Sequence, residues 1–133
     1  MARRVQDLEC WRLADDLRSE VHAICAQPAV TERRRFCDGF SEAAGSVCRN
    51  ISEGFDRFDS GPIVQFFGYA LASLAEVEDY LRESLSRRFI VPERYQKDLD
   101  LAEHTRATML NFKRYHETKL RQQGKRPHRA RRT

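Results

Sequence analysis

The stretch from Phe36 to Gly54, FCDGFSEAAGSVCRNISEG, has the most regular hydrophobic pattern in the chain. Its apolar and small residues recur every three or four positions, as they do on one face of an α-helix. They are Phe36, Phe40, Ala43, Ala44, Val47, Cys48 and Ile51. Small residues at 43–46 would let a second helix approach closely. We expect Thr31 to cap this helix, and Gly54 to end it in the left-handed conformation that glycine adopts easily.

Three further segments have the same helical periodicity. They run from about Val5 to Ala26, from about Pro62 to Leu85, and from Pro92 to about Leu120. Pro28 is expected to close the first of them, and Ser60 or Asp59 to cap the second. Four amphipathic segments joined by short turns favour an all-α fold, an antiparallel up-down-up-down four-helix bundle.

Length and composition favour one soluble helical domain. The chain has 133 residues, with 41% apolar and 33% charged residues and only 6 Gly and 4 Pro, which suits amphipathic helices. The most apolar run, Ile63 to Ala75, is too short for a transmembrane helix. Acidic residues soon after Arg3 and Arg4 take the place of a signal peptide's apolar region. We therefore expect a cytoplasmic protein without a membrane partner.

Positive charge is concentrated at the C-terminus. The last residues, 121–133, read RQQGKRPHRARRT and contain six Lys or Arg and no acid. The other 18 basic residues share residues 1–120 with all 20 acids, so that part has a formal charge of about −2. The tail lacks the apolar residues that would offset the entropy cost of ordering it. We predict a bundle over 1–120 and a disordered basic tail over 121–133.

The tail is the first candidate for nucleic-acid binding. Its basic side chains would attract phosphates and release counterions; they are Arg121, Lys125, Arg126, Arg129, Arg131 and Arg132. Few aromatic residues accompany them, so recognition would be mainly of the backbone. The alternative is a tail that only keeps the protein soluble.

A second candidate is the triplet Arg33, Arg34 and Arg35, expected in the first turn of the second helix. Positive charge there opposes the helix dipole, which favours a role in binding an anion. The alternative is three solvated arginines whose charge is balanced by Glu32 and Asp38.

Asn50 and Glu53 lie three residues apart and so share one helix face, and Ser73 and Glu76 have the same spacing in the next helix. We predict that these four form a hydrogen-bonded polar lock between the two helices, with Gly54 as its hinge. The alternative is a polar pocket with catalytic carboxylates. No histidine accompanies them as an acid–base partner, which favours the lock.

Residues that could bind metals or perform catalysis form no known motif. The four histidines lack the i, i+4 spacing of helical zinc sites, and the nearest pairing is His22 with Cys25. The Glu-x-x-His pairs of di-iron bundles and the glycine-rich phosphate and dinucleotide loops are absent. We expect no catalytic residues, no metal, no cofactor and no small-molecule substrate. A small enzyme that uses Glu53 and Glu76 is the least favoured alternative.

Several residues together resemble one known family. NISEG (residues 50–54) follows Ala43-Ala44 and precedes Phe66-Phe67 and Glu76, and the opening DLECWRLADDL has a Leu-x-x-Trp-x-x-Ala spacing. This combination, spread over about 5–115, resembles the four-helix bundle family of 23S rRNA intervening-sequence proteins. The resemblance implies a ring-shaped homopentamer without catalytic residues. The family includes a branch, the accessory variability determinants of diversity-generating retroelements. Members of this branch bind nucleic acid and a reverse transcriptase.

The chain departs from that family pattern at Ser41-Glu42, where members commonly carry arginine, and at Ala72-Ser73, where Gly-Ser is common. Its body is also slightly acidic, which shifts any nucleic-acid binding onto the tail. Together with the basic tail, the resemblance therefore implies a non-enzymatic homopentamer that binds RNA or an RNA/DNA hybrid and assists a reverse transcriptase. The alternative is a scaffold of the same family that docks partner proteins and does not bind nucleic acid directly.

Overall fold

The computed structural model describes residues 4–124, and within that range every regular element is helical. The elements are the 3₁₀ turn η1 (Val5–Asp7) and the helices α1 (Glu9–Cys25), α2 (Pro28–Thr31), α3 (Arg34–Phe55), α4 (Ser60–Ser86) and α5 (Pro92–Gly124). The predicted all-α class and the four long helices are confirmed. None of these helices combines the length and the apolar character that a membrane crossing requires.

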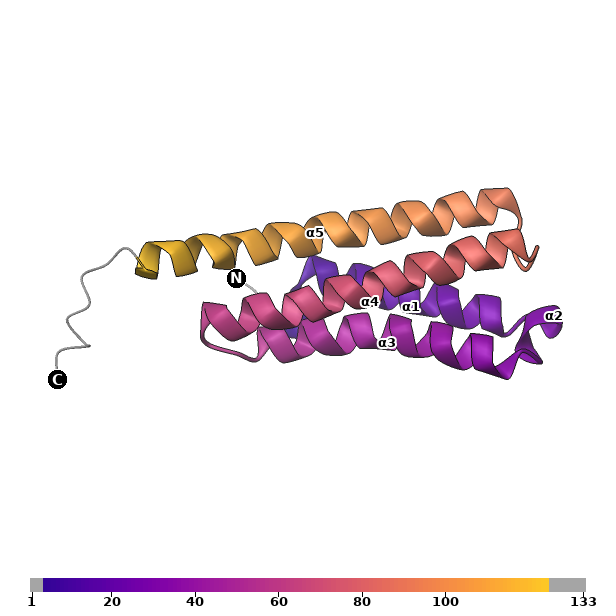
Figure 1. The fold of residues 1–133 in the computed structure, drawn as a ribbon, viewed down its shortest axis with the longest axis horizontal. Coiled ribbons are helices and arrows are strands. Elements are labelled where there is room, and N and C mark those ends of the chain that lie inside the picture. Colours follow the sequence, from indigo (N-terminus) through magenta and orange to yellow (C-terminus); the bar gives the residue numbers. More distant parts are fainter. Residues whose placement is uncertain (1–3, 125–133) are drawn as a thin grey trace.

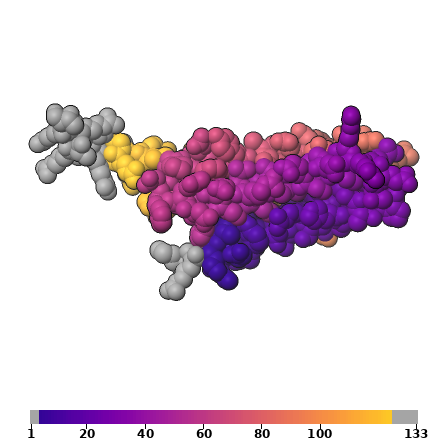
Figure 2. All heavy atoms as spheres, turned by 90° about the horizontal axis from the view of Figure 1, so that it is seen from below, coloured from indigo at the N-terminus to yellow at the C-terminus, as the bar shows by residue number. Residues whose placement is uncertain are grey.

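The four long helices pack as an antiparallel bundle (Figure 1). Each contacts two neighbours: α3 packs on α4, α4 on α5, α5 on α1, and α1 on α3. The first and the last long helix, α1 and α5, therefore lie against each other along one seam. Seen from a second side, the molecule is an elongated rod (Figure 2).

A continuous apolar core runs along the bundle. Its largest fully buried side chains are Phe40, Phe67, Leu17, Ile24, Ile51, Leu74, Leu81, Met109, Val21, Val30, Val47 and Val77. Aromatic rings hold both ends. Phe40 stacks on Tyr80 with ring centroids 5.2 Å apart, and Phe67 stacks on Phe112 at 4.8 Å. The periodic residues that predicted the helices are thus the residues that fill the core.

Two helix starts differ from the prediction. The first helix is broken at Leu8, whose extended backbone (ψ 129) separates η1 from α1. The connection after α1 contains a helix of its own, α2, because Pro28 occupies a first-turn position where its missing N–H costs nothing. Val30 anchors this turn in the core, and the N-cap residue of α3 is Arg33, so the prediction of Thr31 as the cap is wrong.

Gly54 does not end its helix in the left-handed conformation, so that prediction is wrong. The helix α3 continues to Phe55, and no glycine between residues 4 and 124 has a positive φ. The structure gives Gly54 a different role. A Cβ at this position would meet the Phe67 ring at 3.0 Å, so the missing side chain lets α4 approach α3. Gly39 faces Tyr80 in the same way near the other end of α3.

The left-handed residue occurs instead at the end of α4. Arg88 has φ 61. Its N–H donates to the Leu85 carbonyl at 3.0 Å, and the Phe89 N–H donates to the Ser84 carbonyl at 2.8 Å. This is the Schellman arrangement, which closes the free carbonyls at a helix end. An arginine holds the position that glycine usually takes.

The helix α5 is longer than expected. It continues to Gly124, so residues 121–124 are helical and do not belong to a disordered tail. Near this end His116 hydrogen-bonds to the hairpin of α3 and α4, with its Nδ1 2.9 Å from the Ser60 hydroxyl at the start of α4. The following turns project beyond the bundle (Figure 1).

The role of Gly54 can be tested with two identical substitutions. Gly68→Ala in α4 meets no atom within 4 Å, so the better helix propensity of alanine should raise the free energy of unfolding by about 0.5–1 kcal/mol. Gly54→Ala should lower it instead, because Phe67 is fully buried and cannot move away from the new methyl group. Urea unfolding measures both. An equal gain in the two variants would contradict close packing at Gly54.

Candidate nucleic-acid interface

Most of the predicted basic tail lies outside the described residues. This applies to Lys125, Arg126, Arg129, Arg131 and Arg132. Arg121 is the exception: it is exposed on the last turns of α5, and its guanidinium donates to the Thr118 hydroxyl at 3.1 Å. The tail therefore follows directly from an exposed helical segment.

The arginine triplet lies at the start of α3. Arg33 is the N-cap residue and Arg34 and Arg35 are the first two helical residues, and all three are exposed. The first turn of α3 contains no acid. A shallow hollow at this position is lined by Glu32, Arg33, Arg34, Arg35, Phe36 and Arg87.

Aromatic rings position part of this arginine group. The Arg33 guanidinium lies 5.1 Å from the centre of the Phe89 ring, and that of Arg87 lies 4.9 Å from the same ring. Arg87 also pairs with Glu83 at 2.9 Å. Phe89 itself packs edge-on against Phe36, with ring centroids 5.3 Å apart. The hollow thus has a fixed aromatic floor with cationic sides.

The triplet and the end of α5, from which the tail continues, lie at opposite ends of one protomer (Figure 1). The helix α5 begins at the same end of the bundle as the triplet, and its 33 residues span about 50 Å. A single protomer therefore does not bring the two groups into one patch. They are two separate basic surfaces.

Ion pairs neutralise most cations along the flanks of the bundle. Partners include Arg18 with Asp15, Arg49 with Glu42, Arg57 with Glu53, Arg82 with Asp79, and Arg106 with Glu78. Among residues 4–124, the Lys and Arg side chains without a carboxylate partner are Arg12, Arg33, Arg34, Arg35, Arg88, Arg114, Lys119 and Arg121. Apart from Arg12, these belong to the two ends of the molecule.

Only part of the predicted polar lock comes together. The Ser73 hydroxyl lies 2.8 Å from the Ser46 hydroxyl across the contact of α3 and α4. The Asn50 amide donates to the Ser46 carbonyl at 2.9 Å. Ser46 is therefore the centre of the hydrogen-bonded group, although the spacing argument did not select it.

The two glutamates of that lock lie elsewhere. Glu53 is exposed and pairs with Arg57 at 3.1 Å, and Glu76 is exposed on α4. They do not converge with Ser73 and Asn50 into a polar pocket. The predicted lock is therefore wrong for Glu53 and Glu76, because helical spacing alone does not show which side chains of a face point inward.

A buried acid pair in the seam between α1 and α5 was not predicted from the sequence. The Asp98 side chain is 0% exposed, and its Oδ2 accepts from Arg94 Nε at 2.8 Å. Its Oδ1 has no hydrogen-bond donor among residues 4–124. Glu20, held 3.0 Å from Lys97, faces it from α1.

Two carboxyl groups can lie side by side here if one of them is protonated. Burial, and then the hydrogen bond with Glu20, raise the pKa of Asp98 from 3.8 to about 6. The hydrogen bond with Asp98, helped by Lys97 and Arg94, lowers the pKa of Glu20. Below about pH 6 the proton is therefore held by Asp98, which can then donate to the Glu20 carboxylate.

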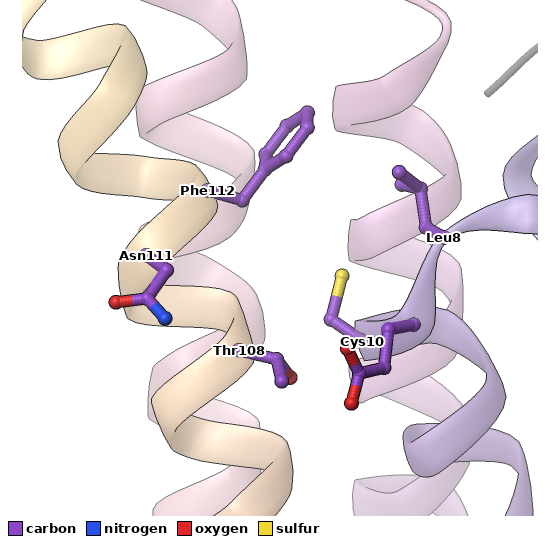
Figure 3. Close-up of a pocket in the computed structure, with 6 residues that line it drawn as sticks. Leu8, Cys10, Thr108, Asn111 and Phe112 are labelled. Atoms are coloured by element: carbon purple, nitrogen blue, oxygen red, sulfur yellow. The ribbon is translucent and has the colours of Figure 1, made fainter. Parts of the chain in front are cut away.

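Another hollow lies between the start of α1 and the middle of α5 (Figure 3). Side chains of Thr108 and Phe112 project from α5 toward Cys10 and Leu8. Burial raises the pKa of the Cys10 thiol to about 11, so it is protonated at neutral pH and is a poor nucleophile. Within residues 4–124 no group of three or more His, Cys, Asp and Glu side chains is placed to hold a metal ion.

Fold and surface together define the class: an all-α four-helix bundle whose unpaired cations gather at its two ends. The family model of the 23S rRNA-intervening sequence protein matches residues 6–126. The chain therefore belongs to this family, as its resemblance had indicated. No curated protein matches it.

The acid pair predicts a pH dependence of stability. An acid whose pKa is raised on folding contributes most below its unfolded value, near pH 4, and this contribution is lost as the pH rises through about 6. From pH 4.5 to 7.5 the wild-type free energy of unfolding should therefore fall relative to that of Asp98→Asn. Urea titrations measure the difference, with Asp100→Asn, an exposed position on the same helix, as control. A difference independent of pH would contradict the protonated pair.

Proposed function

We propose that the chain is a non-enzymatic accessory protein that binds RNA or an RNA/DNA hybrid. One observation carries the proposal: the unpaired cations of the bundle gather at its ends, and one end continues into a tail with six Lys or Arg and no acid over residues 121–133. Cations without a carboxylate partner keep their full attraction for phosphate.

Membership of the 23S rRNA-intervening sequence protein family supports a link with RNA, and the resemblance to its accessory variability determinant branch suggests the partner. We propose a homopentamer that assists the reverse transcriptase of a diversity-generating retroelement. Five copies would bring about 30 tail charges together, so weak contacts would add up when one nucleic acid spans several tails.

A scaffold that docks proteins is the second candidate function. Phe58, in the turn between α3 and α4, is fully exposed, and it is the apolar side chain that such a contact would cover. In this case binding would not depend on nucleic acid. A complex with a partner protein that survives both nuclease and high salt, captured by an immobilised full chain, would favour the scaffold.

Removal of Lys125–Thr133 tests the tail. This deletion takes away five positive charges per chain. Affinity for RNA at moderate salt should fall at least about tenfold, and the slope of log K against log salt should flatten by up to about 0.7 per lost phosphate contact. Fluorescence anisotropy over a salt series measures both, and thermal melting checks that the bundle is intact. An unchanged affinity would contradict binding through the tail.

The other end needs its own variant. One variant combines Arg33→Ala, Arg34→Ala and Arg35→Ala. It should weaken RNA binding, in addition to the effect of the tail deletion, only if the hollow at the start of α3 also contacts phosphate. The matched control is Arg82→Ala, because Arg82 is an exposed arginine already paired with Asp79. Equal binding by the triple variant and the control would remove the triplet from the proposed interface.

Mass measurement tests the assembly. Five copies of the 15.6 kDa chain should appear as one species in sedimentation equilibrium and in native mass spectrometry. The same mass is expected after nuclease treatment, since the ring does not need nucleic acid to form. A monomer across a wide concentration range would contradict the homopentamer but leave binding by single tails intact.

A further inference from the structure

We propose that the end of α5 is a preformed binding strip for single-stranded nucleic acid, in which Tyr115 stacks on an unpaired base. This inference rests on the proposed function and gives it a substrate class. It concerns residues 113–124, which the sequence argument had assigned to the bundle or to a disordered tail.

The strip is accessible because α5 leaves the bundle near His116. The bond between His116 and Ser60 is the last hydrogen bond to another helix, and none of residues 117–124 is buried. Eight helical residues extend about 12 Å beyond this point. The projecting end is clear in both views (Figures 1 and 2).

One broad face of this segment combines cations, hydrogen-bond donors and a ring. Residues three, four and seven apart share a helix face. The exposed residues of this face are Arg114, Tyr115, Thr118, Lys119, Arg121 and Gln122. None of its three cations has a carboxylate partner among residues 4–124, whereas Lys113, on the inner side, pairs with Glu117 at 3.0 Å. The outward face is therefore positive.

Tyr115 is held in place and yet open to solvent. The residue is 59% exposed, and its ring packs edge-on against the His116 ring with centroids 5.0 Å apart. His116 is itself fixed by Ser60 and by the neighbouring Phe112 ring at 4.9 Å. A fixed, exposed ring loses little entropy when a base stacks on it.

The nearest cation suits the same contact. Lys119 Nζ lies 5.3 Å from the centre of the Tyr115 ring, a cation–π distance. A base that stacks on the ring would take the place of Lys119, whose ammonium would then be free to pair with the adjacent phosphate. Aromatic stacking beside cations that follow the backbone is the usual arrangement for single strands.

Charge continues along the chain past this strip. Residues 113–133 contain nine Lys or Arg and one acid, Glu117. A strand that lies on α5 would therefore reach the tail without crossing a negative region. Stacking requires an unpaired base, whereas a duplex offers only its phosphates here. The strip should thus prefer single strands, and the tail alone should not.

Tyr69 provides a matched control on the same bundle. It is 50% exposed on α4, and its hydroxyl accepts a hydrogen bond from Gln65 at 2.7 Å. The helix α4 has no Lys or Arg before Arg82, and Arg57, which lies over the neighbouring Phe66 ring, is already paired with Glu53. A general effect of removing an exposed tyrosine would appear in both positions.

The test compares the full chain with Tyr115→Ala, Tyr115→Phe and Tyr69→Ala. Fluorescence anisotropy measures binding to a 20-nucleotide oligouridine and to an RNA hairpin duplex of the same length, over a salt series. Tyr115→Ala should weaken binding to oligouridine about tenfold, without a change in the salt slope or in duplex binding. Tyr115→Phe and Tyr69→Ala should bind as the wild type does. Thermal melting checks that each variant is folded.

Two failures can be told apart. If the wild type binds both probes but Tyr115→Ala binds oligouridine unchanged, or loses duplex binding equally, the stacking strip is overturned and the proposed function stands. If the wild type binds neither probe at low salt, the proposed function fails and this inference fails with it. An effect of Tyr69→Ala equal to that of Tyr115→Ala would also overturn the strip.

Discussion

The close contact between α3 and α4 is the constraint on which the rest of the bundle depends. Three positions on α3 carry small residues where α4 comes nearest, each facing a residue of α4. The facing pairs are Gly39 with Tyr80, Ser46 with Ser73, and Gly54 with Phe67. Because Gly39 and Gly54 have no side chain, the rings of Tyr80 and Phe67 can pack directly against the backbone of α3. The helices α1 and α5 then close the remaining faces.

The sequence predicted four helices because their apolar residues recur with helical spacing over long segments. It failed at Gly54 because glycine has two uses, a positive φ and the absence of Cβ, which look the same in one sequence. Only the contact with Phe67, thirteen residues further on and on another helix, shows which of the two uses applies. Arg88 could not be predicted, since arginine carries no signal for a left-handed backbone.

The candidate sites were predictable in part. Clusters of Lys and Arg are visible in any sequence, so the triplet and the tail were found. Their separation to opposite ends depends on the bundle's topology. Asp98 was missed because α5 is rich in charge, and a buried acid has the same letter as an exposed one. The place of Tyr115 beside the point where α5 leaves the bundle depends on where α4 begins, which only the packing of His116 against Ser60 reveals.

The hydrogen bond between Ser46 and Ser73 helps to set the register of α3 against α4. Small residues on α3 recur about every seven positions, so a helix hairpin shifted by two turns would again find room for close approach. Such a shift would set Ser46 against an aromatic side chain of α4, either Phe66 or Tyr80, and leave its hydroxyl without the Ser73 partner. The hydroxyl pair at 2.8 Å is thus formed only in the native register, and it adds to the register that the short connection 56–59 and the buried side chains impose.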